Sequence, residues 1–203
     1  KKTALNSLHK KYGAKLVSFA GYEMPIQYSK GIIEEHKSTR GNAGIFDVSH
    51  MGQLFIKGDD SLAKDLEKIF PTELSNAKLN QSKYSFLMNE EAGIYDDLII
   101  TKVEGGFNIV LNAACKETDL KILSGLLENK YKMTLSEELS LIAIQGPKAV
   151  KILEKIINGV SDLKFMNGNT FKYLDANIYI TRSGYTGEDG FEISIKNKEV
   201  EEF

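Results

Sequence analysis

A long apolar β-hairpin is the feature that most constrains the fold of this chain. Its predicted arms are residues 95–103 and 107–111, and residues 104–106, Glu-Gly-Gly, form the predicted turn. Glycine tolerates the backbone angles of a tight turn, so two extended runs this close in sequence are expected to pair antiparallel. Residues 98–100 are all apolar, which is typical of a strand in the interior of a sheet.

Helical and strand patterns alternate along the rest of the chain, without repeats or a Pro/Gly-rich linker. Over residues 52–135 the predicted order is β-α-β-β-α-β, which is typical of a split α+β unit. Three extended runs in the final third, at 171–174, 177–182 and 191–196, predict antiparallel strands. The predicted fold class is therefore α+β, with mixed and antiparallel sheets, flanking helices and a split subdomain inserted in a larger domain.

Local signals predict several element boundaries. Residues 45–56 predict a single strand in which Gly52 marks a bulge or a close approach of another segment. The helix after Pro147 is expected to bury four apolar residues: Val150, Leu153, Ile156 and Ile157. Side chains that can accept a hydrogen bond from a first helical turn are expected to cap three helices: Thr3, Ser29, and Asp59 or Asp60.

Composition excludes several broad classes of protein. The chain has 26 Lys and Arg against 28 Asp and Glu, a formal net charge of −2, so no basic field favours nucleic acid or an anionic membrane. No run approaches the roughly 20 apolar residues of a membrane span, and no signal peptide is visible. A single cysteine, Cys115, excludes an internal disulfide. Since the first residue is not Met and residues 200–203 resemble a first helical turn, we expect the sequence to be trimmed at both ends.

Two adjacent carboxylates, Asp96 and Asp97, stand at the start of the apolar arm of the hairpin. Side chains alternate between the two faces of a strand, so at most one of the two points into any given cavity. A carboxylate beside an apolar strand is partly desolvated and therefore suited to accept a proton. The pattern alone leaves two interpretations open, a proton-accepting site or an exposed pair that ends a turn.

A second candidate site is the glycine-rich string at residues 183–192. Its glycines permit close approach of the backbone, and Tyr185 could stack on a flat heterocycle. No lysine follows the last glycine, so the string is not a phosphate loop, and a ligand loop and an elaborate hairpin turn both remain open. The histidines show no metal-ligand spacing, and no metal is expected; they are His9, His36 and His50.

Six strings in collinear order resemble the aminomethyltransferase, or T protein, of the glycine cleavage system. They cover essentially the whole chain: F-A-G-Y-E-M-P (19–25), F-D-V-S-H-M-G (46–52), G-I-Y-D-D-L-I (93–99), N-A-A (112–114), Q-G-P-K-A (145–149) and R-S-G-Y-T-G-E-D-G-F-E (182–192). The resemblance implies transfer of the aminomethyl carbon from the lipoyl arm of the H protein to tetrahydrofolate. The products would be 5,10-methylenetetrahydrofolate, ammonia and the reduced lipoyl arm.

The resemblance also implies roles for individual residues. The second Asp of the D-D-L string, Asp97, would lie near N10 of the folate and accept its proton as the five-membered ring closes. The remaining implied folate-pocket positions are Met51, Tyr84, Asn112, Tyr185 and Glu192. The implied partner is the lipoylated H protein, and the implied location is the cytoplasm, or the mitochondrial matrix in a eukaryote.

The implied domains are a discontinuous folate-binding domain, residues 1–51 plus 137–203, and an inserted α+β subdomain, residues 52–136. Family members extend beyond the position of Phe203, so the folate-binding domain is expected to be incomplete at its C-terminus. Two alternatives remain open: a related folate-dependent demethylase, and a non-enzymatic folate-binding scaffold. The intact G-I-Y-D-D-L-I string favours the enzyme over the scaffold, since such scaffolds tend to lose it.

Overall fold

The computed structural model describes the whole chain, residues 1–203, as two compact units. One unit is Lys1–His50 together with Glu138–Phe203, and the other is Met51–Glu137. Each has its own hydrophobic core. None of the helices combines the length and the apolar character that crossing a membrane requires.

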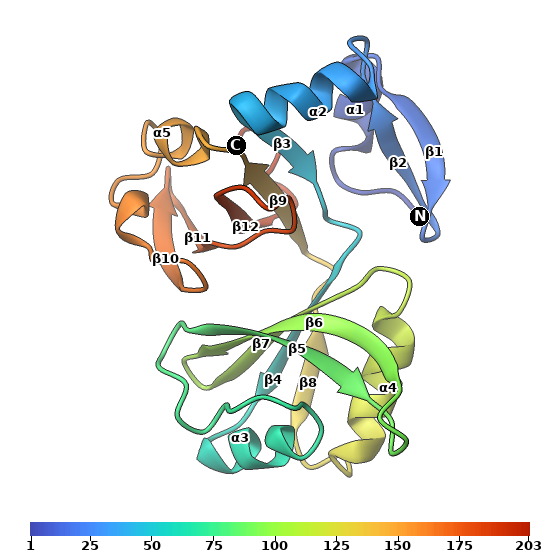
Figure 1. Cartoon of the computed structure of the whole chain (residues 1–203), viewed down its shortest axis with the longest axis vertical. Helices are drawn as coiled ribbons and strands as arrows, with labels where there is room; N and C mark the ends of the chain where they lie inside the picture. The colour runs from blue at the N-terminus through green and yellow to red at the C-terminus, as the bar shows by residue number, and fades with distance from the viewer. The chain divides into compact units, whose positions relative to one another are not determined.

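The Met51–Glu137 unit is one five-stranded sheet with two helices (Figure 1). The strand order is β5-β6-β7-β4-β8, and neighbouring strands are antiparallel. In chain order its elements are β4 (Gly52–Lys57), α3 (Asp60–Glu67), β5 (Ser82–Met88), β6 (Ile94–Val103), β7 (Gly106–Leu111), α4 (Lys116–Leu126) and β8 (Lys132–Leu135).

Both helices of this unit contribute to one core against the sheet. Leu62 and Leu66 of α3 and Leu123 of α4 are fully buried with apolar residues of β4, β6 and β7. The helix α3 starts where the sequence predicts, because the Asp59 carboxylate accepts a hydrogen bond from the Ser61 N–H at 2.9 Å. Burial of leucine side chains from both helices fixes which face of the sheet they cover.

The predicted hairpin is confirmed as β6 and β7, with one difference in the turn. The turn contains Glu104 and Gly105, while Gly106 already pairs with Val103 and Lys57. A Cβ at Gly106 would overlap the Ile56 carbonyl, so glycine is required there inside the sheet. Three strands, β5, β6 and β7, lie between the two helices, one more than the predicted β-α-β-β-α-β order contains.

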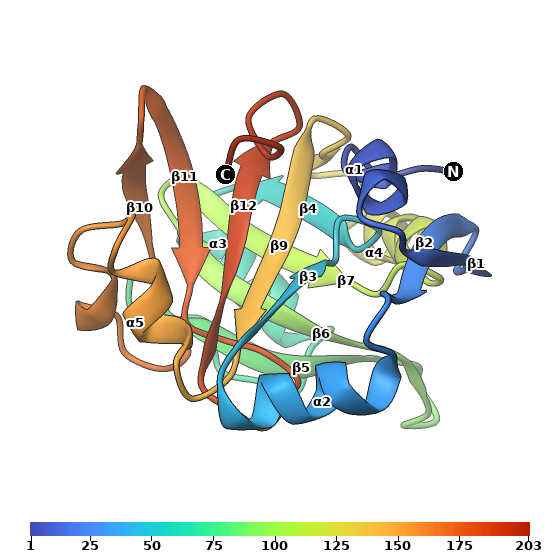
Figure 2. The same cartoon turned by 90° about the horizontal axis from the view of Figure 1, so that it is seen from above.

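The other unit has a five-stranded antiparallel sheet, a two-stranded sheet and short helices. Figure 2 shows the larger sheet with its strands side by side in the order β10-β11-β12-β9-β3, and β1 pairs with β2. The elements are α1 (Asn6–Lys11), β1 (Lys15–Phe19), β2 (Tyr22–Gln27), α2 (Ile32–Gly41), β3 (Gly44–Asp47), β9 (Leu139–Gln145), α5 (Ala149–Leu153), the 3₁₀ turn η1 (Val160–Asp162), β10 (Gly168–Tyr173), β11 (Ala176–Thr181) and β12 (Gly190–Lys196). The predicted antiparallel arrangement of the last three strands is confirmed.

The prediction of one strand over residues 45–56 is wrong. The chain forms two strands in different sheets, since β3 pairs with β9 while β4 pairs with β7 and β8. The break follows from Asp47, whose carboxylate accepts a hydrogen bond from the Ser49 N–H at 3.0 Å and turns the backbone. Gly52 starts β4 and is not a bulge in it, but it is a point of close approach, since a Cβ there would lie 3.0 Å from the Lys116 side chain.

Three further local predictions are wrong. The helix α1 starts at Asn6, and it is the Thr3 carbonyl, not its side chain, that accepts the Asn6 N–H. The helix α2 starts after Gly31, whose φ of 80° ends the preceding turn, so Ser29 caps nothing. The helix α5 ends at Leu153, which leaves Ile156 47% exposed instead of buried.

Candidate functional site

Asp96 and Asp97 lie on opposite faces of β6, as strand alternation predicts. Asp96 is 6% exposed, on the face that carries the core residue Leu98. Asp97 is half-buried on the other face and pairs with Phe86 of β5. The two carboxylates therefore have different surroundings, and only Asp97 is open to a ligand on its face of the sheet.

Asn112 connects the two carboxylates. Its side-chain amide donates to Asp96 Oδ1 at 2.8 Å and to Asp97 Oδ1 at 3.0 Å, and its backbone N–H donates to Asp96 Oδ2 at 3.2 Å. The residue follows directly after β7, at the level where that strand reaches Asp97. An amide with two N–H groups can serve two acceptors at once, so Asn112 fixes both side chains.

Tyr84 completes the group around Asp97. Its hydroxyl donates to Asp97 Oδ2 at 2.9 Å, and this hydrogen bond raises the pKa of Tyr84 above its ordinary value. The ring is 49% exposed and meets Phe86 edge-on, with centroids 5.2 Å apart. Asp97 thus accepts from two uncharged donors, and beside it stands an aromatic surface on which a flat ring could stack.

Sequence reasoning missed a carboxyl group behind this site, Asp119 of α4. It is 1% exposed, neither of its oxygens accepts a hydrogen bond from a donor, and its hydrogen-bonding neighbour is Asp96. Burial, followed by the hydrogen bond and the charge of Asp96, raises the pKa of Asp119 to about 7. A signal was present: Asp119, Leu123 and Leu127 follow one another at four-residue spacing on the buried helix face.

Glu192 lies in the other unit, in the centre of β12. Phe191, Ile193 and Ile195 point into the core, so Glu192 points to the opposite face, where it is 7% exposed. The Ser183 hydroxyl donates to Glu192 Oε2 at 2.7 Å. Burial raises the pKa of Glu192, and the hydrogen bond from Ser183 partly opposes this. A buried carboxylate of this kind is an acceptor for a ligand that carries paired N–H donors.

The glycine-rich string forms a loop between β11 and β12, and an ion pair orders it. Arg182 donates through Nε and Nη2 to the two oxygens of Asp189, at 2.8 and 2.6 Å. The guanidinium also donates to the Leu163 carbonyl at 2.8 Å. Arg182 therefore holds the Asp189 pKa below its ordinary value and joins the loop to the segment after η1.

The Gln145 side chain lies inside this loop, and its position explains why two residues of the string must be glycine. The side-chain amide donates to the Ser183 carbonyl at 2.9 Å and accepts from the Thr186 hydroxyl at 3.0 Å. A Cβ at either Gly184 or Gly190 would overlap the Gln145 amide. Glycine is needed at both positions so that a buried side chain can cross the loop.

The remaining predicted site residues have fewer described contacts. Tyr185 is 57% exposed in the loop, and Met51 is half-buried immediately before β4. The structure brings Asp97, Tyr84 and Asn112 together in one unit. Tyr185 and Glu192 belong to the other unit, at the loop and on the strand that follows it.

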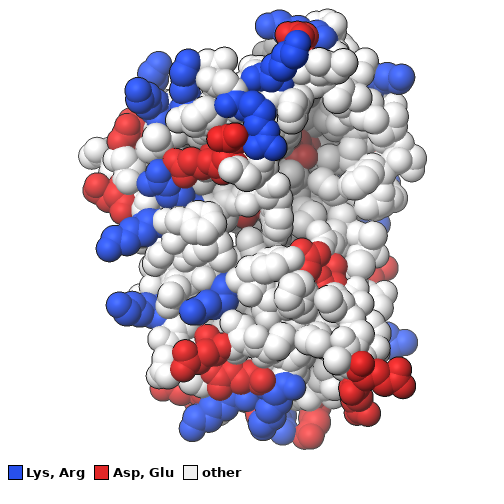
Figure 3. Space-filling view, viewed as in Figure 1, with Lys and Arg blue, Asp and Glu red and all other residues white.

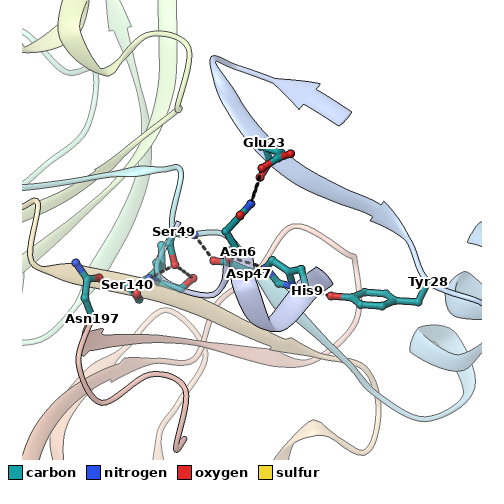
Figure 4. Close-up of polar contacts among 9 residues, drawn as sticks. Asn6, His9, Glu23, Tyr28, Asp47, Ser49, Ser140 and Asn197 are labelled. Atoms are coloured by element: carbon teal, nitrogen blue, oxygen red, sulfur yellow. Dashed lines mark hydrogen bonds and ion pairs between the residues drawn. The ribbon is translucent and has the colours of Figure 1, made fainter. Parts of the chain in front are cut away.

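One buried histidine, His9, is held by hydrogen bonds to two partners that the sequence did not identify. His9 of α1 hydrogen-bonds Asp47 Oδ2 through Nε2 at 2.9 Å and the Tyr28 hydroxyl through Nδ1 at 2.7 Å (Figure 4). Burial would raise the pKa of Asp47, but hydrogen bonds from His9, Ser49 and Thr3 together hold it below its ordinary value. The cluster of His9, Tyr28 and Asp47 connects α1, β3 and the residue directly after β2, and its spacing in sequence gives no local motif.

Surface charge gives no comparable feature. On the face drawn in Figure 3, Lys and Arg side chains are interspersed with Asp and Glu, and neither sign covers a large continuous area. The ion pair between Arg40 and Glu188, at 3.1 Å, is partly exposed and adds little to stability. No group of three or more His, Cys, Asp or Glu side chains is arranged to hold a metal ion.

The sequence matches one protein family, described as the GCVT N-terminal domain, over residues 5–203. The mitochondrial aminomethyltransferase of Dictyostelium discoideum is 42% identical over 210 residues, which cover 98% of this chain and 52% of that protein. The aminomethyltransferase of Geobacillus sp. (strain WCH70) is 40% identical, with 98% and 56% covered. The chain thus spans about half the length of the curated relatives it matches.

Solved structures agree with the sequence match. The crystal structure of glycine cleavage system aminomethyltransferase T from Bartonella henselae has a TM-score of 0.89 and 39% identity, over 98% of this chain and 54% of that one. Heterotetrameric sarcosine oxidase from Corynebacterium sp. U-96 has a TM-score of 0.58 at 14% identity over 83% of this chain, which shows the fold alone. The predicted α+β class is confirmed.

Proposed function

The chain belongs to the GCVT N-terminal domain family, and from that premise we propose that its full-length protein is an aminomethyltransferase of the glycine cleavage system. It would take the one-carbon unit from the aminomethyl-lipoyl arm of the H protein and pass it to tetrahydrofolate. The observation that carries the proposal is the Asp97 carboxylate, held by Tyr84 and Asn112 on a strand that the family string G-I-Y-D-D-L-I occupies.

Asp97 is the proposed general base. Folate N5 bonds to the aminomethyl carbon, N10 then bonds to the same carbon, and the carbon–sulfur and carbon–nitrogen bonds of the donor break. N5 and N10 each lose a proton in this exchange, and the two protons end on the departing ammonia and lipoyl thiol. A carboxylate within hydrogen-bond reach of N10 can accept its proton as the ring closes and pass it on. Support for Asp97 comes from its fixed orientation, since two neutral donors hold its oxygens without supplying a compensating charge.

The folate-contact roles rest on the chemistry of the side chains. Glu192 suits the amino-pyrimidine edge of the pterin, because a buried acceptor selects a ligand with N–H donors. Tyr84 and Tyr185 offer exposed rings for stacking. Asn112 and Met51 are proposed to line the pocket near Asp97.

We further propose that the unit of residues 1–51 and 137–203 is the principal folate-binding domain and that residues 52–136 form an inserted subdomain that supplies Asp97. The H protein is the proposed partner. The proposed compartment follows the organism, the cytoplasm in a bacterium and the mitochondrial matrix in a eukaryote, as the name of the Dictyostelium relative indicates for that protein.

The test is single-turnover transfer by the full-length protein. Aminomethyl-loaded H protein and tetrahydrofolate are mixed, and 5,10-methylenetetrahydrofolate and ammonia are measured together. Equimolar release of both products is the expected result. Transfer from a methylated amine but not from the H protein would replace the proposal by a demethylase. Folate binding without any transfer would replace it by a non-enzymatic scaffold.

A further inference from the structure

Two buried carboxyl groups, those of Asp96 and Asp119, lie next to the site around Asp97. Asp96 accepts hydrogen bonds from the side chain and the backbone of Asn112. Asp119 has no such donor, although it is the more deeply buried of the two, at 1% exposure against 6%. A buried ionised carboxylate without a donor is strongly disfavoured, so this arrangement needs an explanation.

Two ionised carboxylates cannot hydrogen-bond each other, because both are acceptors only. Asp119 nevertheless lies beside Asp96, and no donor reaches either of its buried oxygens. One proton held between the two groups satisfies Asp119 and leaves a single negative charge for the pair. The same arrangement leaves Asp96 free to accept both hydrogen bonds from Asn112.

We propose that Asp119 and Asp96 share one proton and that this pair is the positioning device for Asp97, acting through Asn112. This inference rests on the proposed function of Asp97 as the base. The shared proton keeps Asp96 oriented toward Asn112, and the Asn112 amide in turn donates to Asp97 Oδ1 at 3.0 Å. If the pair lost its proton, two adjacent negative charges would repel each other and displace the Asn112 amide.

The groups around Asp119 agree with a shared proton. From β6 it faces Asp96, and from the turn before α4 it faces Cys115, while Asp97 adds negative charge to the same region. Burial, followed by the charges of Asp96 and Asp119, raises the pKa of the Cys115 thiol. Lys116 is the first residue of α4, and its side chain lies close to Gly52. A Cβ on Gly52 would be 3.0 Å from the Lys116 side chain.

The first experiment measures the proton directly. Side-chain carboxyl ¹³C resonances of the full-length protein are followed against pH. We expect one Asp resonance to titrate near pH 7, and the Asp119→Asn variant to lack it. If no Asp carboxyl titrates well above the ordinary value of 3.8, no shared proton exists and the proposal is overturned. The wild-type titration decides this point even if the variant does not fold.

Stability gives an independent measure with a defined sign. Asp119 binds its proton in the folded state between pH 3.8 and about 7, whereas the unfolded chain has released it. The free energy of unfolding of the wild type should therefore decrease as pH rises through this window, relative to Asp119→Asn. The matched control is Asp60→Asn, an exposed first-turn carboxylate of α3, which should show no such difference.

The pH profile of transfer separates a positioning role from a structural one. We expect the wild-type rate to fall above pH 7, where the pair loses its proton. Asp119→Asn keeps a donor for Asp96 at every pH, so this variant should not show the fall. Asp119→Ala supplies no donor and should lower the rate at all pH values. Identical profiles for the wild type and Asp119→Asn would overturn the positioning role. If the wild type transfers nothing, the proposed function fails, while the carboxyl titration still decides whether the pair exists.

Discussion

Partly buried carboxylates have opposite surroundings in the loop around Arg182 and at the start of strand β6. In the loop, the Asp189 carboxylate is neutralised by a guanidinium through two hydrogen bonds. At β6, the hydrogen bonds that hold Asp96 and Asp97 come from Asn112 and Tyr84, which are uncharged. The first arrangement lowers the free energy of the folded loop, whereas the second leaves negative charge available for proton chemistry.

The difference gives a rule for finding function in this fold. A carboxylate that is matched to a cation has its proton affinity lowered and is suited to hold structure, as the Asp189 pKa indicates. A carboxylate that is buried, and that also lies next to another carboxylate, has its proton affinity raised, as the pKa of about 7 for Asp119 indicates. Substitutions at the two regions should therefore affect different quantities, stability in the loop and transfer rate at β6.

The largest expected effect is that of Asp97→Asn. The amide keeps the shape of the side chain but cannot accept the N10 proton, so transfer should slow by about 10²–10⁴-fold. The barrier would rise by about 2.8–5.6 kcal/mol, since each factor of ten is about 1.4 kcal/mol. The measurement is single-turnover formation of 5,10-methylenetetrahydrofolate by the full-length protein, with Asp175→Asn, an exposed turn residue, as control.

Stability should change little in Asp97→Asn, because the half-buried side chain retains an acceptor for Tyr84. Urea unfolding of the variant checks this. Full transfer activity in a folded Asp97→Asn protein would show that Asp97 is not the base. We call Asp96, Asp97, Asn112, Tyr84 and Asp119 the β6 cluster. A large loss of stability with an unchanged transfer rate would mean that this cluster stabilises the fold, as Arg182 does, and has no part in transfer.

The second effect concerns the loop. Asp189→Ala removes both acceptors of a guanidinium that is 21% exposed, and should lower the free energy of unfolding by about 1.5–3 kcal/mol. Because the Asp189 pKa is lowered in the folded state, its contribution is present above its ordinary value of 3.8 and is lost as pH falls through the folded value. Urea titrations of wild type and variant at pH 7 and at pH 3 measure this.

Arg182→Lys tests the geometry of the same pair. Lysine keeps the charge but cannot donate two parallel hydrogen bonds, so it should destabilise the loop by less than Asp189→Ala does. Equal stability of wild type and Asp189→Ala would show that the ion pair contributes nothing measurable. The Arg182–Asp189 pair would then not be a stabilising counterpart to the carboxylates of β6, and the proposed difference between the two regions would be wrong.

A smaller effect is expected from Gly184→Ala. The added methyl group would overlap the buried Gln145 amide, and repacking should cost about 1–3 kcal/mol. Gly41→Ala is the matched control in the same unit, because a Cβ at Gly41 meets no atom within 4 Å. It should leave stability unchanged or raise it by about 0.5–1 kcal/mol. Thermal unfolding of the two variants compares them, and equal melting temperatures would contradict the crossing of the loop by Gln145.

The sequence predicted those parts of the fold that depend on neighbouring residues. The β6–β7 hairpin needs only an apolar run and a glycine turn, and the Asp59 cap acts within one helical turn. The break in residues 45–56 could not be predicted in this way. The Asp47–Ser49 turn is local, but the two halves separate because β3 pairs with β9 while β4 pairs with β7 and β8, all of which are distant in the sequence.

In the candidate site, too, only those features that depend on neighbouring residues could be predicted from the sequence. Alternation separated Asp96 from Asp97, but only family resemblance selected Asp97, and its role remains a prediction. Asn112 and Tyr84 reach it across two different strand pairs, so no local pattern connects the three. Asp119 was missed because the helix was interpreted from its leucines, although Asp119 shares their buried face.

The smallest expected effect is on the reactivity of the Cys115 thiol. Its alkylation rate reports on the charge of Asp96 and Asp119 without any substrate. The thiol pKa is raised by burial and then by the charges of Asp96 and Asp119. Asp119→Asn removes one of these charges, so the thiolate fraction at pH 8 should increase and alkylation by iodoacetamide should be faster. Asp189→Ala, in the other unit, is the control and should leave the rate unchanged. An alkylation rate that does not respond to Asp119→Asn, in a protein with unchanged stability, would mean that Asp119 carries no charge at that pH. The proton would then be held by Asp119 well above pH 7, and the pair beside Asp97 would carry a single negative charge throughout the working range.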